Sequence, residues 1–156
     1  PRCGDQMMEK RRFQIQSAPN QFVKIYPIIA DMVEELKLEG NDKFRFAVCI
    51  SEAFTNAFYH GNHADPNKII ELIFCWDSET LSVEIGDQGQ GTMKDINLNA
   101  KLESISPEET CGRGVAIINS FADNLEVIEK DGGGLKVKMS WHRQPKPDSK
   151  PSVVTS

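Results

Sequence analysis

A glutamate, an asparagine and a histidine are spaced four residues apart in the segment 51–62, as Glu52, Asn56 and His60. On an α-helix this spacing places all three side chains on one face, one turn above the next. The face would then offer a carboxylate base, an amide oxygen for a metal ion and an imidazole. We therefore expect this helix face to carry chemistry.

Two glycine-containing segments follow it along the chain. Asp87 lies at the end of the strand that the alternating stretch 81–85 predicts, and the nearby glycines let the backbone approach a ligand closely. Gly112 and Gly114 open an apolar helical run, and the unpaired amides and dipole of a helix start attract phosphate. The three segments together predict a nucleotide-binding site.

In this order, the three motifs resemble those of the GHKL, or Bergerat-fold, ATPases, and the chain is most similar to the small anti-sigma factor serine kinases of that superfamily. The matching stretch covers residues 12–141. Each motif alone is common in unrelated proteins. The inference rests on their combination, with a strand before the second motif and a helix after the third.

The resemblance and the needs of phosphoryl transfer assign roles to three side chains. Glu52 is the candidate general base, which would take the proton from an incoming serine or threonine hydroxyl. Asn56 would give Mg²⁺ a neutral oxygen ligand while the ion bridges the phosphates of ATP. Asp87 would accept a hydrogen bond from the adenine amino group, a contact that guanine cannot make.

The glycines have a supporting role in this interpretation. Gly89 and Gly91 would allow the close approach and hinge a lid, while Gly112 and Gly114 would let backbone amides face the phosphates. The expected nucleotide-binding set is completed by two residues that follow these glycines, Thr92 and Val115.

Three positions leave alternatives open. Arg113 suits either a phosphate or a carboxylate of a partner protein. His60 either touches the nucleotide or is stabilised at its helix end by the dipole alone. The family commonly has a hydroxyl residue after the glycine that opens the last strand, whereas here Leu135 follows Gly134. Because Glu52 is retained, catalysis is still expected.

Periodicity predicts the elements that position these residues. We expect strands at 12–17, 68–76, 81–86, 125–129 and 135–141, and helices at 20–39, 41–60 and 115–122, with Asn20 capping the first helix and Gly40 ending it. The loop 92–111 would be an ATP lid. The expected fold is a two-layer α/β sandwich of the α+β type, with a mixed, mostly antiparallel sheet and helices on one face.

Composition limits the architecture to one domain. With 156 residues and 39% hydrophobic content, we expect an ATPase domain at 11–143 between an amino-terminal tail (1–10) and a disordered carboxyl-terminal tail (144–156). The net charge of -5 disfavours a nucleic-acid partner. No segment resembles a signal peptide or membrane span, so we expect a cytoplasmic protein. The cysteine spacing matches no zinc motif, and Cys49 and Cys75 are expected to be buried thiols.

Two functions compete at this point. In the first, the protein phosphorylates a serine or threonine of an anti-anti-sigma protein of the STAS type and sequesters a sigma factor when that antagonist is phosphorylated. In the second, it is a binding module that holds its partner with Glu52 idle. A histidine kinase catalytic domain is disfavoured because a phosphoacceptor hairpin has no room before residue 12. The resemblance also favours a homodimer.

Overall fold

A five-stranded sheet and a layer of helices make up the computed structural model, which describes residues 7–91 and 110–143. The strands are β1 (Glu9–Gln16), β2 (Ile69–Trp76), β3 (Thr80–Gly86), β4 (Asn124–Glu129) and β5 (Leu135–His142). They lie in the order β1-β2-β3-β5-β4, and each neighbouring pair is antiparallel. The described sheet is therefore antiparallel throughout, where the prediction also allowed parallel pairing.

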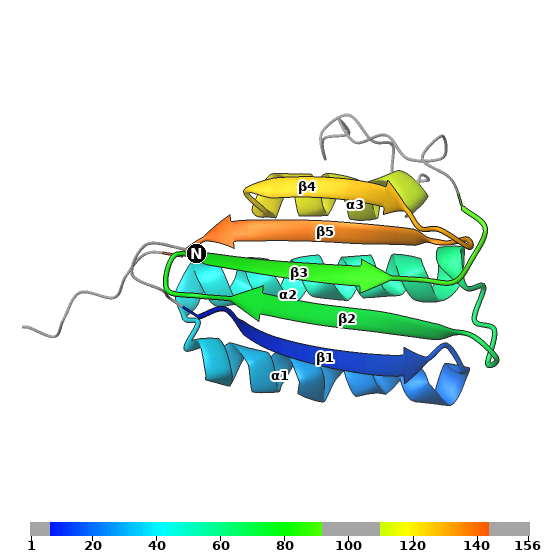
Figure 1. Cartoon of the computed structure of the whole chain (residues 1–156), viewed down its shortest axis with the longest axis horizontal. Coiled ribbons are helices and arrows are strands. Elements are labelled where there is room, and N and C mark those ends of the chain that lie inside the picture. The colour runs from blue at the N-terminus through cyan, green and yellow to red at the C-terminus, as the bar shows by residue number, and fades with distance from the viewer. Residues whose placement is uncertain (1–6, 92–109, 144–156) are drawn as a thin grey trace, which may run out of the picture.

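Three helices cover one face of this sheet, as Figure 1 shows: α1 (Ile25–Leu36), α2 (Gly40–Thr55) and α3 (Thr110–Phe121). The predicted two-layer α/β sandwich is thus confirmed. Residues 92–109 of the expected lid, including Thr92, and the expected carboxyl-terminal tail fall outside the described residues, as does most of the amino-terminal tail. Residues 110–111, also expected in the lid, are instead the start of α3. Within the described ranges, no helix has both the length and the apolar character needed to cross a bilayer.

The hairpin β2–β3 follows directly from the sequence. Ile70, Leu72 and Phe74 alternate along β2 with half-buried residues and point into the core, as expected of a strand with one covered face. Asp77 closes the turn, because its Oδ1 accepts hydrogen bonds from the amides of Glu79 and Thr80, each over 2.8 Å. An aspartate that bonds the backbone two residues on is a typical turn residue.

The turn between β4 and β5 depends on three consecutive glycines. Gly132, Gly133 and Gly134 have φ angles of 86°, 109° and 98°, a region that residues with a side chain rarely adopt. The amide of Lys130 donates to the carbonyl of Gly134 over 2.9 Å and closes the turn. The start of β5 is thereby brought beside the end of β3, where Asp87 lies.

The first helical segment differs from its prediction. It begins as a 3₁₀ helix, η2 (Pro19–Lys24), which continues into α1, and its first-turn residue is Pro19 with Ala18 as N-cap, so Asn20 is not the cap. Helix α1 ends at Leu36, followed by Lys37 in the left-handed conformation with a φ of 56°. Gly40, expected to end this helix, is instead the first residue of α2.

The second helix changes its winding near its end. Helix α2 is α-helical to Thr55 and continues as a π-helix, η3 (Asn56–Gly61), in which the amide of Asn62 donates to the carbonyl of Ala57 five residues back. The extra residue in this turn re-aims the side chains after it, and such turns are frequent at functional sites. Periodicity alone did not predict this switch.

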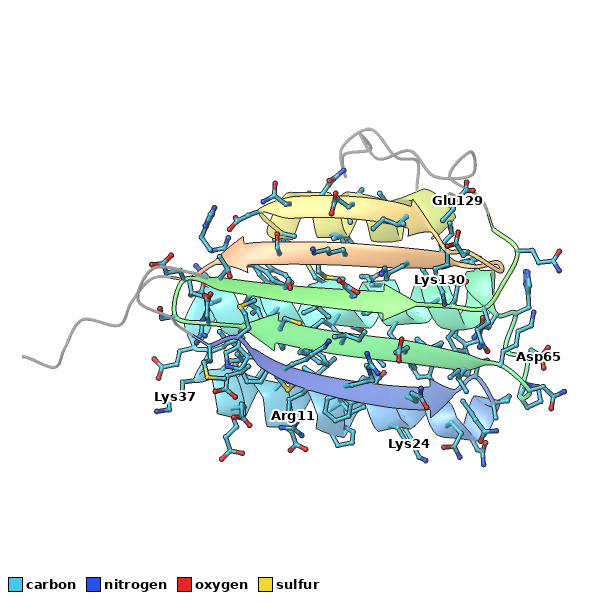
Figure 2. All side chains as sticks on the ribbon, viewed as in Figure 1. Arg11, Lys24, Lys37, Asp65, Glu129 and Lys130 are labelled. Carbon is cyan, nitrogen blue, oxygen red and sulfur yellow. The ribbon has the colours of Figure 1, made fainter. Side chains whose placement is uncertain are left out.

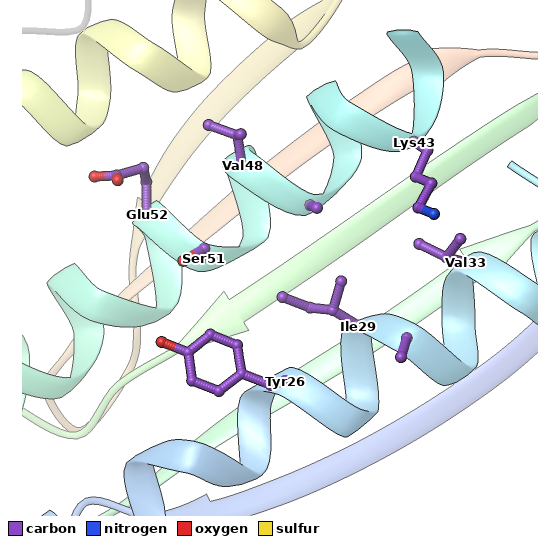
Figure 3. A pocket seen from close by; sticks show the side chains of 9 residues that line it. Tyr26, Ile29, Val33, Lys43, Val48, Ser51 and Glu52 are labelled. Atoms are coloured by element: carbon purple, nitrogen blue, oxygen red, sulfur yellow. The ribbon is translucent and has the colours of Figure 1, made fainter. Parts of the chain in front are cut away.

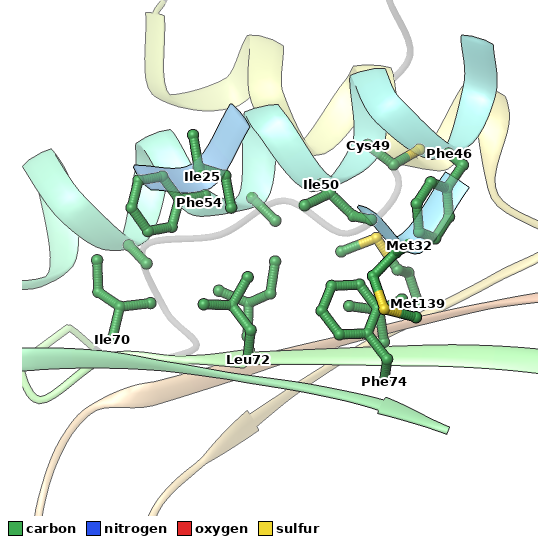
Figure 4. Close-up of a cluster of buried hydrophobic side chains, with 14 of the residues drawn as sticks. Ile25, Met32, Phe46, Cys49, Ile50, Phe54, Ile70, Leu72, Phe74 and Met139 are labelled. Atoms are coloured by element: carbon green, nitrogen blue, oxygen red, sulfur yellow. The ribbon is translucent and has the colours of Figure 1, made fainter. Parts of the chain in front are cut away.

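The core lies between α2 and the sheet. The predicted stripe of α2 is confirmed, since Phe46, Ile50 and Phe54 are fully buried and Ala57 nearly so. Figure 4 shows Phe46, Ile50 and Phe54 facing Leu72 and its neighbours on the strands, with Met32 of α1 and Met139 of β5 alongside. Each large side chain buried in this way contributes roughly 1.5–3 kcal/mol, so the site is built on a rigid scaffold.

One ion pair ties the edge strand to the first helix. Arg11 of β1 lies 3.2 Å from Glu35 of α1, and both side chains are about half exposed. Figure 2 shows Arg11 at the edge formed by α1 and β1, away from Lys130 at the opposite end of the sheet. An exposed pair of this kind is worth roughly 0–1 kcal/mol, so packing rather than charge holds α1 in place.

Candidate nucleotide-binding site

Asp87 lies one residue beyond β3 and is 6% exposed. Its Oδ1 accepts hydrogen bonds from the backbone amides of Gly89 (2.9 Å) and Leu135 (3.1 Å). The main chain of Asp87 is held as well, because its amide donates to the carbonyl of Leu135 and its carbonyl accepts from Nζ of Lys130, over 2.9 and 2.7 Å. The carboxylate is therefore buried and fixed in one orientation.

The second carboxylate oxygen of Asp87 lies against a glycine of the first motif. A Cβ built on Gly61 would collide with Oδ2 and Cγ of Asp87, and one built on Gly89 would collide with the carbonyl of Gly61. Both positions thus require glycine for lack of space. The end of η3 and the Asp87 loop are therefore in direct contact, although Gly61 and Asp87 are 26 residues apart in the chain.

The first and third motifs also meet. A Cβ on Gly114 would collide with the side-chain amide of Asn56, whose Oδ1 would lie 3.2 Å away. Helix α3 begins at Thr110, however, so Gly112 and Gly114 lie within it and do not precede it. The first four amides of a helix have no partner within it, and in α3 these belong to residues 110–113. They lie within about one turn of Gly114, so the helix start remains near Asn56. Val115, which follows Gly114, is half-buried.

Glu52 and Asn56 keep the expected spacing of one α-helical turn and are half-exposed, whereas His60 lies in the π-helical segment and is exposed. The winding of the helix thus changes between Asn56 and His60. Gly61, which follows His60, lies against the carboxylate of Asp87.

An open groove of about 490 Å³ runs between α1 and α2. Figure 3 shows Lys43 at one end and Tyr26, Ser51 and Glu52 at the other, with aliphatic side chains between them. Next to it the ring of Phe22 contacts the rings of Tyr26 and Tyr59, and both tyrosines are about half exposed. An apolar surface thus adjoins the carboxylate of Glu52.

The predicted metal ligand, Asn56, offers an amide oxygen. Among the described residues, no three His, Cys, Asp or Glu side chains gather in a way that could hold a metal ion. Mg²⁺ needs few protein ligands and keeps several waters when it binds together with phosphates. A site with Asn56 as the main protein ligand therefore fits Mg²⁺ and does not fit a transition metal.

The two described cysteines differ in burial. Burial raises the pKa of the Cys49 thiol to about 12, although the Arg45 guanidinium opposes this shift and Glu52 adds to it. Cys49 is thus a buried thiol, as predicted. Cys75 was expected to be buried too, but it lies at an outward position of β2 and is half-exposed.

Several residues of this region have no motif of their own. Lys130 contacts the carbonyl of Asp87 from β4–β5, and the side chains of Asn62 and Gln88 bridge the segments around it. Gly61 and Asn62 are the last two residues of the first motif, the segment 51–62, so their position was a signal that could have been used. Lys130 lies 43 residues from Asp87, and no local pattern indicates it.

Comparison with known proteins agrees with this geometry. The model of the histidine kinase-like ATPase domain matches residues 15–141, and the chain belongs to this family, the GHKL ATPases. Within the family, the chain is similar to proteins named anti-sigma F factor. It is 30% identical over 114 residues to the one from Oceanobacillus iheyensis, covering 72% of this chain and 77% of that protein. It is 26% identical over 132 residues to the one from Anoxybacillus flavithermus, covering 84% and 89%.

Solved structures show the same fold at low sequence identity. The RsbU and RsbW domains of a Mycobacterium tuberculosis protein align with a TM-score of 0.58 at 15% identity, over 89% of this chain and 33% of that one. This chain thus spans about a third of the length of that protein. The SiaB–SiaC complex from Pseudomonas aeruginosa contains a chain that aligns with a TM-score of 0.56 at 9% identity, over 85% and 89%.

Proposed function

We propose that the protein binds Mg-ATP and transfers the γ-phosphate to a serine or threonine of an anti-anti-sigma protein. The observation that carries this proposal is the meeting of all three motifs. Asn56 packs on Gly114, and Gly61 at the end of the same helix packs on Asp87. A carboxylate, an amide and a helix start thus surround one region, as a nucleotide site requires.

Adenine would be read by Asp87. Both described hydrogen bonds to its carboxylate go to Oδ1, so Oδ2 beside Gly61 is the oxygen available to accept from the adenine amino group. Guanine has a carbonyl at the corresponding position, and two acceptors facing each other repel. The orientation of this carboxylate therefore favours ATP over GTP.

The phosphates would lie at the start of α3. The free amides of residues 110–113 and the helix dipole favour an anion there, and Arg113 would add a charge to the phosphates or to the partner protein. Oδ1 of Asn56 would be a protein ligand of Mg²⁺, whose charge offsets that of the phosphates. Val115 and the expected lid residue Thr92 complete the proposed set with Gly89, Gly91, Gly112 and Gly114.

Glu52 would act as general base. The proton passes from the substrate hydroxyl to the Glu52 carboxylate as the hydroxyl oxygen bonds the γ-phosphorus, and the bond to the β,γ-bridging oxygen breaks to release ADP. Glu52 lies one turn before Asn56, the proposed Mg²⁺ ligand, so base and phosphates would be adjacent. His60 has no assigned step in this mechanism.

The partner protein would reach Glu52 across the groove between α1 and α2. The nucleotide occupies the α3 side of α2 in this proposal, because Asn56 faces Gly114 there. The groove borders Glu52 from the α1 side and offers an apolar floor and exposed aromatic rings. We infer that the antagonist, a STAS-type protein, docks here and that its phosphorylation leaves the protein free to hold a sigma factor, in the manner of the anti-sigma F factors it resembles.

A second function is a binding module without catalysis. Leu135 in place of the hydroxyl residue common in the family favours this alternative, because it removes one side-chain contact on the adenine side. In that case Glu52 would be an ordinary half-exposed carboxylate. Nucleotide binding and partner binding would remain, and phosphate transfer would be absent.

Replacing Glu52 separates the two functions. Purified protein with radiolabelled Mg-ATP and a panel of STAS-type proteins should label one of them, and Glu52→Gln should reduce labelling by about 10²–10⁴-fold with ADP affinity retained. Glu34→Gln, which removes an exposed carboxylate of α1, is the matched control and should label normally. Nucleotide binding without labelling of any antagonist by the wild type would favour the binding module.

A further inference from the structure

Asn62, directly after the π-helical turn, is fully buried and uses both ends of its side-chain amide. Its Oδ1 accepts a hydrogen bond from the backbone amide of Gln88 over 2.7 Å. Its Nδ2 donates to the carbonyl of Ile69 (3.0 Å) and to Oγ of Ser17 (3.2 Å). One side chain therefore joins the end of β1, the start of β2 and the loop that carries Asp87.

A second side chain closes the same connection from the other side. Oε1 of Gln88 accepts a hydrogen bond from the amide of Ile69 over 2.8 Å, while the Gln88 amide is held by Asn62. Ser17 is in turn held by the loop before β2, since its hydroxyl lies 2.6 Å from the carbonyl of Asp65. We call Asn62, Gln88, Ser17 and Ile69 the Asn62 clasp.

The Asn62 clasp lies next to the contact between Gly61 and Asp87. Asn62 is the neighbour of Gly61, and Gln88 is the neighbour of Asp87, so the 2.7 Å bond runs beside the place where Oδ2 of Asp87 meets Gly61. A shift of the Gln88 amide would rotate the adjoining Asp87 out of its bonds with Gly89 and Leu135. Asn62 thus holds the residue next to Asp87.

We propose that Asn62 is a positioning residue that orients the Asp87 carboxylate and thereby sets the preference of the site for adenine. The inference rests on the proposed nucleotide site and adds the determinant of its base selectivity. An amide is the side chain suited to this position, because it must accept from Gln88 and donate to Ser17 and Ile69 at once. A carboxylate would place an oxygen against two acceptors, and an aliphatic residue would satisfy none of the three groups.

The test compares two variants of the same clasp. Asn62→Ala removes the acceptor of the Gln88 amide, whereas Ser17→Ala removes a neighbouring hydroxyl and leaves the Asn62–Gln88 bond in place. Both should lower the melting temperature. Isothermal titration with Mg-ADP and Mg-GDP should show that Asn62→Ala lowers the affinity for ADP about tenfold. The difference between the affinities for ADP and GDP should become smaller. Ser17→Ala should keep the ADP-to-GDP affinity ratio of the wild type.

A readout without nucleotide keeps this inference separate from the proposed function. Hydrogen–deuterium exchange at the amides of Gln88, Gly89 and Leu135 should be faster in Asn62→Ala and unchanged in Ser17→Ala. If the wild type binds ADP and both variants keep its selectivity and its exchange rates, the role of Asn62 is refuted and the nucleotide site stands. If the wild type binds no adenine nucleotide, the proposed function and the selectivity role fail together, and faster exchange would then show only that Asn62 holds the loop.

Asn62→Asp tests the acceptor of the Asn62 clasp separately from its donor. It retains an oxygen that accepts from Gln88, loses the donor to Ser17 and Ile69, and places an oxygen against these two groups. It should therefore be less stable than the wild type and still prefer ADP to GDP. Loss of the preference in Asn62→Asp, with normal exchange at Gln88, would overturn the assignment.

Discussion

The backbone amide of Leu135 donates a hydrogen bond to Oδ1 of Asp87 over 3.1 Å. Leu135 stands where related proteins commonly have a hydroxyl residue, and its side chain lies close to Gly91. Every residue except proline has a main-chain amide hydrogen, so leucine at position 135 supports the carboxylate as well as a hydroxyl residue would. The orientation of Asp87 is thus compatible with the leucine.

Asp87→Asn should abolish the preference for adenine. An amide that keeps its oxygen on the Gly89 and Leu135 amides would turn its NH₂ group toward the adenine amino group, and two donors repel. We expect the affinity for Mg-ADP to fall by about 10–100-fold, measured by titration calorimetry, with less effect on Mg-GDP. Asp123→Asn, which alters a carboxylate that accepts from the His142 amide far from the site, is the control. Unchanged ADP affinity in Asp87→Asn would contradict the assignment.

Gly114→Ala should weaken nucleotide binding even though alanine favours helices. In an unconstrained helix interior this change would add about 1 kcal/mol of stability. Here the new Cβ would collide with the amide of Asn56, so the proposed Mg²⁺ ligand must move. We expect lower affinity for Mg-ADP and a reduced dependence of binding on Mg²⁺, both measured by titration. Ser120→Ala in the same helix adds no Cβ and should leave the affinity for Mg-ADP unchanged. Equal affinities of the two variants would argue against the contact between Gly114 and Asn56.

Ala30→Asp should impair the use of the protein substrate and leave nucleotide binding intact. Ala30 lines the groove between α1 and α2, and a carboxylate there would have to be desolvated beneath a docked partner. We expect a higher KM for the antagonist at an unchanged affinity for ADP, measured by labelling kinetics and titration. Gln14→Asp, on the exposed side of β1, should behave as the wild type. A normal KM in Ala30→Asp would mean that the partner docks elsewhere.

Cys49 should resist alkylation in the folded protein. Burial raises the pKa of its thiol from 9.0 to about 12, so the reactive thiolate is absent at pH 8. Iodoacetamide should modify this residue only after denaturant is added, as peptide mass spectrometry would show. Rapid modification of Cys49 in the folded protein would contradict its burial.

The same shift predicts a loss of stability at high pH. The unfolded chain releases the Cys49 proton above about pH 9 while the folded chain holds it to about pH 12. The contribution of this thiol to the free energy of unfolding is therefore fully present below pH 9 and is lost as the pH rises toward 12. Cys49→Ala should show a smaller alkaline decrease in chemical denaturation, and an identical decrease would contradict the shift.

The local elements were largely predictable from the sequence, because a strand or helix with one buried face shows its period in neighbouring residues. The alternation of β2, the stripe of Phe46, Ile50 and Phe54, and the turn at Asp77 were all readable in this way. The boundaries of the helices were less predictable from the sequence. The start of α3 at Thr110 and the 3₁₀ start at Pro19 are decided by packing, which local propensity does not contain.

The sequence by itself determined which residue types are available for nucleotide chemistry and in which elements they lie. Only the tertiary structure decided which of them meet. Three features show this: the π-turn at the end of α2, the contact of Gly61 with Asp87, and the clasp of Asn62. They join segments distant in the chain or depend on one extra residue in a turn. Such contacts arise when the helices settle on the sheet, because the free energy that selects them comes from burial and hydrogen bonding between elements and leaves no periodic trace in either one.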